Sequence, residues 1–498
     1  MKFFSISGLL FVFLIGHGSV RAEQAKLPNI VFILADDLGW ADLSSYGNMF
    51  NESPNIDKLV NEGKMFTNAY SAGPVCSPTR ASIMSGQYPA RLGFLCHIPG
   101  HWRPFEQVLT PSNRAQFLPE ETVTIAEQMK EAGYATGYFG KWHLGKEEKN
   151  HPLNQGFDMA NTGKGYYNTQ FDPERNDHKE MRFSDRITAF GLDFIEQNKD
   201  KPFFLFLAHY DVHVKLDADL DLINKYLEKE KVNTYPCNAI YAAMIEHIDR
   251  SVGQIMAKLE SAGLSENTIV VFTSDNGGVI SENLYPFARG DRKTTSRFDR
   301  WETMADSKKY IYRDSPLKFI SSSNVPLRNE KGSLYEGGIR VPLIVKWPGN
   351  IEPGTKSDAI VISNDYYPTM MEIAGLNQSD VIQDGKSLVD EFVSDKFDPE
   401  RALFWHYPVF HHDVPSGVIR KGDWKLMENF MTGELFLYNL RHDINETTNL
   451  ASEFGEKTEE LYGLLKNWQK EVGAEFPVSN PNFNEQRRYE WGRHPSVR

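Results

Sequence analysis

Cys76 opens the most chemically suggestive motif of the sequence, Cys-Ser-Pro-Thr-Arg. Pro78 has a fixed φ and no backbone N–H, so it suits the first turn of a helix and predicts that Cys76 lies at the helix N-terminus. Unpaired N–H groups and the positive end of the helix dipole favour an anion there, and Arg80 adds a permanent positive charge. A cysteine in this setting is either an activated thiolate or an inert buried side chain. The motif predicts a site for an anionic group.

Two adjacent carboxylates, Asp36 and Asp37, follow the continuous apolar run at residues 29–35. Such a run is typical of a central strand that is buried on both faces. Two carboxylates at the end of a buried strand repel each other unless positive charge lies between them, and a bound cation is the usual remedy. The alternative is an acidic turn that only ends the strand.

A second polar pair, Asp275 and Asn276, follows the apolar strand predicted at residues 268–273. Alone, this pair and the glycines after it would indicate a turn. Together with Asp36 and Asp37, the pair completes a set of oxygen ligands on neighbouring strand ends. Oxygen ligands without histidine or thiolate suit a hard divalent cation, and an irregular set favours calcium over magnesium.

Two more strand ends carry groups that could bind an anion or move a proton. Lys141 and His143 follow a strand predicted near residues 134–139 and lie two positions apart, so both could face one ligand. Alone, this pair would more often be a solvated strand end. The buried strand predicted at 202–208 exits into three polar residues, His209, Asp211 and His213.

The elements that position these residues alternate between strand and helix, which predicts a mostly parallel sheet with its functional loops at the strand carboxyl ends. A long amphipathic helix at 238–262 is predicted to be scaffold. Beyond a boundary near 394–400, short strands and a final helix predict a small antiparallel α+β module, at residues 402–407, 417–420, 424–427, 434–440 and 458–472. The predicted divisions are a signal segment (1–22), a catalytic domain (23–395), the module (396–485) and a loosely ordered tail (486–498).

Composition restricts the class of protein. The chain of 498 residues can bury a large core, and its three cysteines exclude a disulfide framework, although Cys96 and Cys237 could pair. Lys2, an apolar run and the small residues near Ala22 predict a secretion signal, so we expect an exported, periplasmic or secreted protein without a membrane span. The net charge of −13, or −15 without the signal, argues against a nucleic-acid partner.

Two stretches resemble the signatures of the type I sulfatases. The first is Cys-x-Pro-x-Arg at 76–80, and the second runs from Gly133 to Gly145 and includes Gly-Lys-Trp-His-Leu-Gly. The resemblance extends from Asn29 to about Leu450. It implies the alkaline-phosphatase-like fold, a large α/β domain followed by a small carboxyl-terminal sheet domain. It also implies that a maturation enzyme oxidises Cys76 to formylglycine, an aldehyde whose hydrate is the nucleophile.

The resemblance also implies roles for individual residues. Calcium held by Asp36, Asp37, Asp275 and Asn276, the acidic cluster, would bind the sulfate and a hydroxyl of the modified residue 76. His213 would protonate the leaving alcohol, alone or together with Lys331, which lies in a segment similar to the lysine-bearing segment of the family. His143 would accept a proton from the nucleophile. Arg80 and Lys141 would hold the nucleophile and the anion. The family usually has a proline before this histidine, whereas this chain has Val212, and we favour His213 over His209.

Three other functions compete with sulfate ester hydrolysis. A phosphatase or phosphonate hydrolase of the same fold would share the metal carboxylates, but a second metal site with extra histidines is not evident in the sequence. A non-catalytic binding protein for sulfated glycans would be expected to have lost Cys76 or a carboxylate, and neither is missing. A thiol enzyme is disfavoured because Asp36 and Asp37 would raise the pKa of the thiol.

The substrate is predicted to be a sulfated carbohydrate, for example an oligosaccharide from algal polysaccharide. His101 and Arg103 lie shortly after the motif helix, and aromatic rings with basic groups suit sugar faces and additional anions. A polar stretch between Ile280 and Asn329 is predicted to face the substrate, with basic and aromatic residues at Arg289, Arg292, Lys293, Arg297, Arg300 and Trp301. The alternative is that these side chains only pack their loops.

Overall fold

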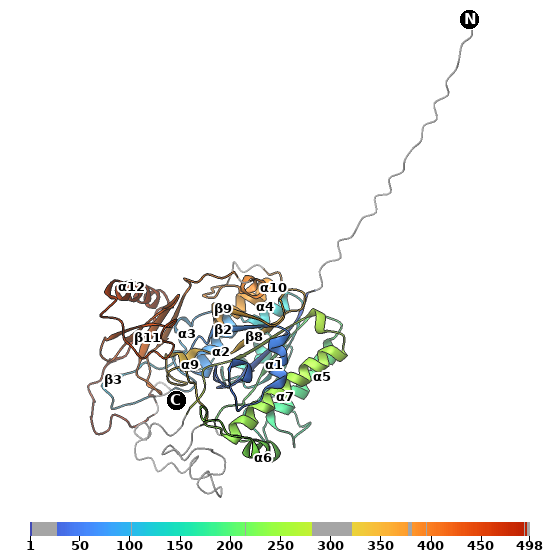
Figure 1. Cartoon of the computed structure of the whole chain (residues 1–498), viewed down its shortest axis with the longest axis horizontal. Coiled ribbons are helices and arrows are strands. Elements are labelled where there is room, and N and C mark those ends of the chain that lie inside the picture. The colour runs from blue at the N-terminus through green and yellow to red at the C-terminus, as the bar shows by residue number, and fades with distance from the viewer. Residues whose placement is uncertain are drawn as a thin grey trace.

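A mixed sheet of eight strands forms the centre of the computed structural model (Figure 1). The structure describes Met1 and residues 27–100, 102–214, 216–280, 321–376, 381–394, 396–492 and 494–495. In spatial order, the strands are β5 (Met159–Thr162), β4 (Ala135–Gly140), β6 (Phe203–Ala208), β1 (Asn29–Ala35), β7 (Thr268–Ser274), β8 (Leu343–Lys346), β2 (Lys64–Tyr70) and β9 (Thr355–Ile362). Only β8 runs antiparallel to its neighbours within this sheet.

Successive apolar side chains of β1 point to opposite faces of the sheet, which explains why helices cover both faces. Val31 and Ile33 belong to one hydrophobic cluster, whereas Ile30 and Phe32 belong to the other. The first cluster includes side chains of α1 (Pro54–Asn61), α5 (Phe183–Asn198), α6 (Leu220–Glu228) and α7 (Ala239–Ser261). The second includes side chains of α2 (Cys76–Ser85), α4 (Ile125–Glu131), α10 (Tyr366–Ile373) and α11 (Val389–Val393). The predicted layered α/β domain is confirmed.

The carboxyl-terminal module is a separate antiparallel sheet of four strands, β10 (Ala402–Tyr407), β11 (Ser416–Lys421), β12 (Trp424–Asn429) and β13 (Leu435–Asn439). Helix α12 (Gly455–Glu471) packs on this sheet through Leu461 and Leu465, which join Val418 and Leu426 in one cluster. Figure 1 shows α12 and β11 at one end of the molecule, beside the large domain. The predicted module is therefore also confirmed.

Three sequence expectations differ from the structure or lie outside it. β5 and β9 were not predicted, because they are short or carry polar residues on an edge of the sheet. The described part of the tail, predicted to be loosely ordered, contacts the large domain: Arg488 pairs with Glu106 at 2.8 Å, and Gly492 forms a β-bridge with Trp102. The signal segment beyond Met1, and most of the stretch predicted to face the substrate, lie outside the described residues.

No helix in the described ranges combines the length and the apolar character that a bilayer crossing requires. All three cysteines are buried, and Cys96 and Cys237 do not form a disulfide with each other.

A buried ion triad fastens the module to the large domain. Lys425 on β12 lies 2.9 Å from Glu336, at the start of α9 (Glu336–Ile339), and 2.7 Å from Glu446. All three side chains are shielded from water, and Glu336 also accepts a hydrogen bond of 2.6 Å from Tyr70 on β2. Because an unpaired buried carboxylate is costly, Lys425 stabilises both acids, and Arg340 supplies a second, longer pair of 3.4 Å to Glu336.

We expect Lys425→Met to lower the free energy of unfolding by about 3–5 kcal/mol, since it removes the ion-pair partner of buried Glu446 and leaves buried Glu336 with only Arg340, at 3.4 Å. Chemical denaturation measures this loss. Lys421→Met is the matched control on the neighbouring strand, because its partner Glu460 is exposed, and a loss below about 1 kcal/mol is expected. Equal losses in the two variants would contradict a special role of the triad.

Candidate active site

Cys76 is the first residue of α2, as the motif predicted. Val75 precedes the helix in an extended conformation, and every residue of α2 is buried. The backbone is held from two sides, because Gly73 accepts a hydrogen bond of 3.0 Å from Thr79 and Pro74 accepts one of 2.8 Å from the N–H of Gly332. These hydrogen bonds thus fix the Cys76 thiol at the N-terminal end of α2.

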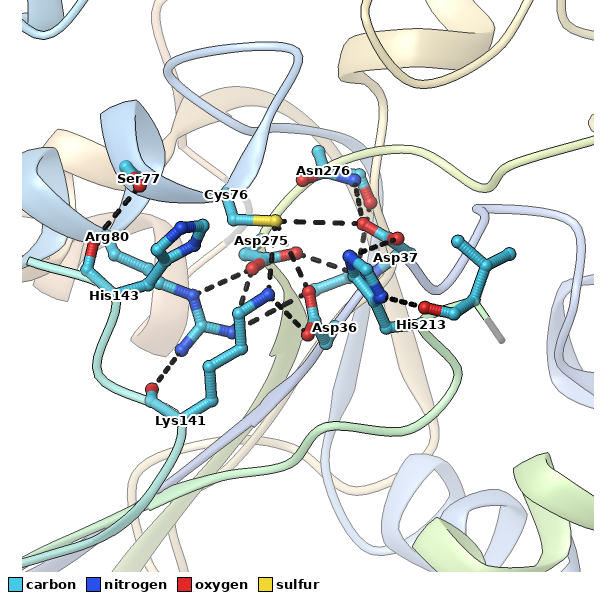
Figure 2. A network of polar contacts seen from close by, with 12 residues as sticks. Asp36, Asp37, Cys76, Ser77, Arg80, Lys141, His143, His213, Asp275 and Asn276 are labelled. Carbon is cyan, nitrogen blue, oxygen red and sulfur yellow. Dashed lines mark hydrogen bonds and ion pairs between the residues drawn. The ribbon is translucent and has the colours of Figure 1, made fainter. Parts of the chain in front are cut away.

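The acidic residues meet because β1 and β7 are adjacent and parallel, with Ala35 opposite Ser274. Figure 2 shows Asp36, Asp37, Asp275 and Asn276 converging beside Cys76. The N–H of Asp37 donates to Asp275 at 3.2 Å, and the amide of Asn276 donates to Asp37 at 2.8 Å. The four side chains are almost completely buried.

Each buried carboxylate faces one cation from a distant part of the chain. The closest pairs are Lys141 Nζ with Asp36 Oδ2 at 2.5 Å, Lys331 Nζ with Asp37 Oδ1 at 2.6 Å, and Arg80 Nε with Asp275 Oδ2 at 2.8 Å. Three carboxylates and three cations therefore balance one another in a cluster of buried side chains. Such pairing is the condition for burying charge at all.

The pKa values follow from burial and from these pairs. Burial raises the pKa of Asp36 to about 7, although Lys141 opposes the shift. Burial also acts to raise the pKa of Asp37, but Lys331 and His213 outweigh it and hold this pKa below its usual range. Lys141 and Lys331 have raised pKa values despite their burial, because the carboxylates favour the ammonium form.

The sulfur of Cys76 lies between two ammonium groups and two carboxylates. Lys141 Nζ is 3.3 Å and Lys331 Nζ is 3.5 Å from Sγ, while Asp36 Oδ1 is 3.4 Å away. Burial, followed by the charge of Asp275, raises the pKa of this thiol far above its usual range. Cys76 is therefore a thiol at neutral pH, which disfavours direct thiolate catalysis.

His143 and Lys141 reach the site from one loop after β4. Ser77 donates a hydrogen bond of 3.0 Å to the carbonyl of His143, and Nε2 of His143 lies 2.9 Å from the carbonyl of Ile98. Both His143 and Asp37 have a φ of 64°, a left-handed conformation that non-glycine residues rarely adopt. Burial and the nearby Lys141 lower the pKa of His143, so its ring is neutral.

His213, and not His209, joins the cluster. Nε2 of His213 is 3.6 Å from Asp37 Oδ2, whereas His209 is fully buried within the fold. Ligand atoms of Asp36, Asp37, Cys76 and His213 all lie within 4.8 Å of one another. Val212 stands where the family usually has a proline. Its N–H donates a hydrogen bond of 2.7 Å to the carbonyl of Asp36.

The acidic cluster fits a hard cation. It offers carboxylate oxygens from Asp36, Asp37 and Asp275, together with Oδ1 of Asn276. That amide oxygen is buried and has no hydrogen-bond partner in the described chain, and an oxygen in this state is suited to a metal. The cation expected from the sequence therefore has a suitable set of oxygen ligands. The ammonium groups of Lys141 and Lys331 lie beside the same oxygens.

The predicted substrate contacts do not belong to this cluster. His101 lies outside the described residues. Arg103 is buried, pairs with Glu106 at 3.5 Å and packs on the rings of Phe410 and Trp491 at 4.9 and 4.5 Å. Its guanidinium thus holds the loop after α3 (Pro89–Leu92) against the module and the tail. The basic and aromatic positions from Arg289 to Trp301 are outside the described ranges.

Sequence reasoning missed the residues that support His213. Tyr166 and Arg182 contact its loop, but neither follows a predicted strand end. Arg182 does stand directly before α5, where a buried arginine gives no periodic signal. Only the three-dimensional arrangement identifies them.

The family model described as Sulfatase matches residues 28–376. This chain belongs to the sulfatase family. A second model, N-sulphoglucosamine sulphohydrolase, C-terminal, matches residues 329–472. The sulfatase is a sulfuric ester hydrolase of the family that the two sequence signatures resembled, and the alkaline-phosphatase-like fold is confirmed.

Relatives and solved structures agree with this assignment. A sulfatase of Formosa agariphila is 32% identical and the match covers 91% of this chain and 90% of that protein. The N-acetylgalactosamine-6-sulfatase of Rattus norvegicus is 31% identical over 80% of this chain and 72% of its own. The crystal structure of Ps i-CgsB superposes with a TM-score of 0.73 at 24% identity, covering 92% of this chain and 95% of that one, and it shows the shared fold.

We expect none of the three thiols to react with a thiol reagent in the native, unmodified sulfatase, because all three are buried. Unfolding in guanidinium should release three reactive thiols per chain. The Cys76→Ala variant is the control and should lose one equivalent only after unfolding. Rapid native labelling that disappears in this variant would show an accessible thiolate and would contradict the raised pKa.

Proposed function

We propose that this sulfatase hydrolyses sulfate esters of carbohydrates, using formylglycine formed from Cys76 and one calcium ion. The observation that carries the proposal is the position of the Cys76 sulfur, 3.3 and 3.5 Å from two buried ammonium groups and beside three carboxylates. This arrangement suits a nucleophile that must meet both a cation and an anionic sulfate. A sugar sulfate is supported by the N-acetylgalactosamine-6-sulfatase relative.

Two groups would supply chemistry that the unmodified chain lacks. Oxidation of Cys76 by a maturation enzyme would supply an aldehyde whose hydrate attacks sulfur, and calcium held by Asp36, Asp37, Asp275 and Asn276 would supply positive charge for the sulfate oxygens. The remaining work falls to side chains of the chain itself.

Lys141 and Lys331 would hold sulfate oxygens, which is supported by the positions of both ammonium groups within hydrogen-bond distance of Sγ of Cys76. Arg80 would fix the geometry, since it joins Asp275 to the carbonyl of Lys141 at 2.8 and 2.5 Å. The positive charges are preorganised, so little rearrangement is needed when negative charge develops on the sulfate.

The two histidines divide the proton transfers in this proposal. His213 would protonate the departing alcohol, which is otherwise a poor leaving group, and Lys331 would assist from the same side. His143 would accept a proton from the nucleophile at Nδ1, because Nε2 is engaged by the carbonyl of Ile98. Entry of an anionic sulfate favours a protonated His213, whose pKa burial and the lysines otherwise lower.

Recognition of the sugar is proposed to involve the loop that carries His101 and Arg103. The aromatic rings packed on Arg103 belong to the module and the tail, so these two segments meet at this loop. Export through the predicted signal segment, to the periplasm or the medium, is part of the same proposal and would place the enzyme where polysaccharide fragments are available.

The decisive experiment is the mass of the tryptic peptide that contains Cys76, from protein produced with a maturation enzyme. Conversion replaces one sulfur and two hydrogen atoms by one oxygen atom, so we expect the peptide mass to fall by that difference and sulfated sugars to be turned over only by the converted fraction. Cys76→Ala should abolish turnover, whereas the buried Cys237→Ala should retain it and is the matched control. Full activity with an unconverted Cys76 would contradict the proposal.

Calcium binding has a readout that is independent of turnover. Calcium at about 100 times its Kd should stabilise the fold by about 2.7 kcal/mol, visible as a rise in Tm, because a ligand that binds only the native state stabilises it. Asn276→Ala removes one oxygen ligand and should weaken calcium binding by about tenfold or more. Asn350→Ala, at an exposed turn, should not. Equal calcium responses in both variants would exclude the proposed site.

A further inference from the structure

The loop that carries His213 is anchored by a buried ion pair outside the catalytic cluster. Arg182 directly precedes α5, and its guanidinium donates hydrogen bonds to the carboxylate of Asp211 and, at 2.6 Å, to the carbonyl of Asp217. Both Arg182 and Asp211 are almost completely buried. The pair therefore fixes the segment on both sides of His213.

Tyr166 contacts His213 directly. Its hydroxyl donates a hydrogen bond to the backbone carbonyl of His213, and its ring lies under the guanidinium of Arg182, with 4.5 Å between Cζ and the ring centroid. The ring of Tyr210 lies 5.1 Å from the imidazole of His213 and 5.2 Å from Tyr166. The imidazole is thus held through its backbone and along one face.

The same loop is joined to the acidic cluster. The N–H of Asp36 donates to the carbonyl of Asp211 at 2.9 Å, and the N–H of Val212 donates back to the carbonyl of Asp36 at 2.7 Å. The backbone of His213 is therefore fixed relative to Asp36, while Tyr166 and Arg182 hold it from the opposite direction. A shift of the loop would move the imidazole relative to both.

We propose that Tyr166 and Arg182 are positioning residues that hold His213 in the orientation needed to protonate the leaving alcohol. This inference rests on the proposed function, because it requires His213 to be the general acid. A general acid is effective only within hydrogen-bond reach of the leaving oxygen, so a small rotation of its ring costs rate without weakening substrate binding. The ring of the neighbouring Tyr167 also lies near Arg182, 5.4 Å from Cζ, but its hydroxyl donates to Asp219 and not to the carbonyl of His213, so Tyr167→Phe keeps the ring contact and is the control.

The test compares Tyr166→Phe with the matched control Tyr167→Phe on a series of aryl sulfates whose phenols differ in acidity. Loss of one hydrogen bond should lower kcat by about five- to tenfold for the least acidic phenol, with KM unchanged. For nitrophenyl sulfate, whose leaving group needs little protonation, the loss should stay below about twofold. Tyr167→Phe should be unaffected throughout. His213→Asn, measured in parallel, should show a stronger dependence of the same kind.

The outcomes separate the two proposals. If His213→Asn depends on the leaving group and Tyr166→Phe does not, Tyr166 does not position the acid, while the proposed function stands. If His213→Asn shows no such dependence, the assignment of His213 as general acid fails and this inference fails with it. A uniform loss of kcat in Tyr166→Phe, accompanied by a lower Tm, would show only a structural role and would overturn the inference.

Discussion

The structure depends on neutralising three buried carboxylates. Asp36, Asp37 and Asp275 are buried at two adjacent strand ends, and none could remain ionised there without a counter-charge. The counter-charges come from α2, from the loop after β4 and from the segment before α9, as Arg80, Lys141 and Lys331. The same requirement that stabilises the fold therefore assembles a site rich in positive charge beside Cys76. A divalent cation and an anionic sulfate would bind to a group of side chains whose charges are already balanced.

The carboxyl-terminal module participates in this arrangement. Its Lys425 pairs with Glu336 on α9, and its His411 packs so closely on Gly332 that a Cβ there would lie 1.5 Å from Nδ1. Gly332 has a positive φ and follows Lys331 directly. The module thus supports the segment that delivers a lysine to the active site, which gives a physical reason for the second domain in a sulfatase.

His209 and His213 both follow β6 and could both transfer protons, but their tertiary contacts differ. His209 continues the buried backbone of the strand, whereas His213 follows a turn that is bonded to Asp36 through Val212. Proline at this position could not donate that hydrogen bond. Tyr210 from the same loop, together with Tyr166 and Arg182 from earlier segments, then completes the surroundings of His213.

The sequence by itself determined the local elements and their chemistry. Apolar runs ending in polar residues predicted β1, β4, β6 and β7 with their site residues, and Pro78 predicted the helix that begins at Cys76, because these signals depend on neighbours along the chain. Tertiary structure decided what depends on distant partners. It placed His213 beside Asp37, turned β8 antiparallel, packed Arg103 against aromatic rings, and brought Lys331 to a carboxylate 294 positions away. Burial of charge and closure of long loops are properties of the whole fold, so no local pattern encodes them.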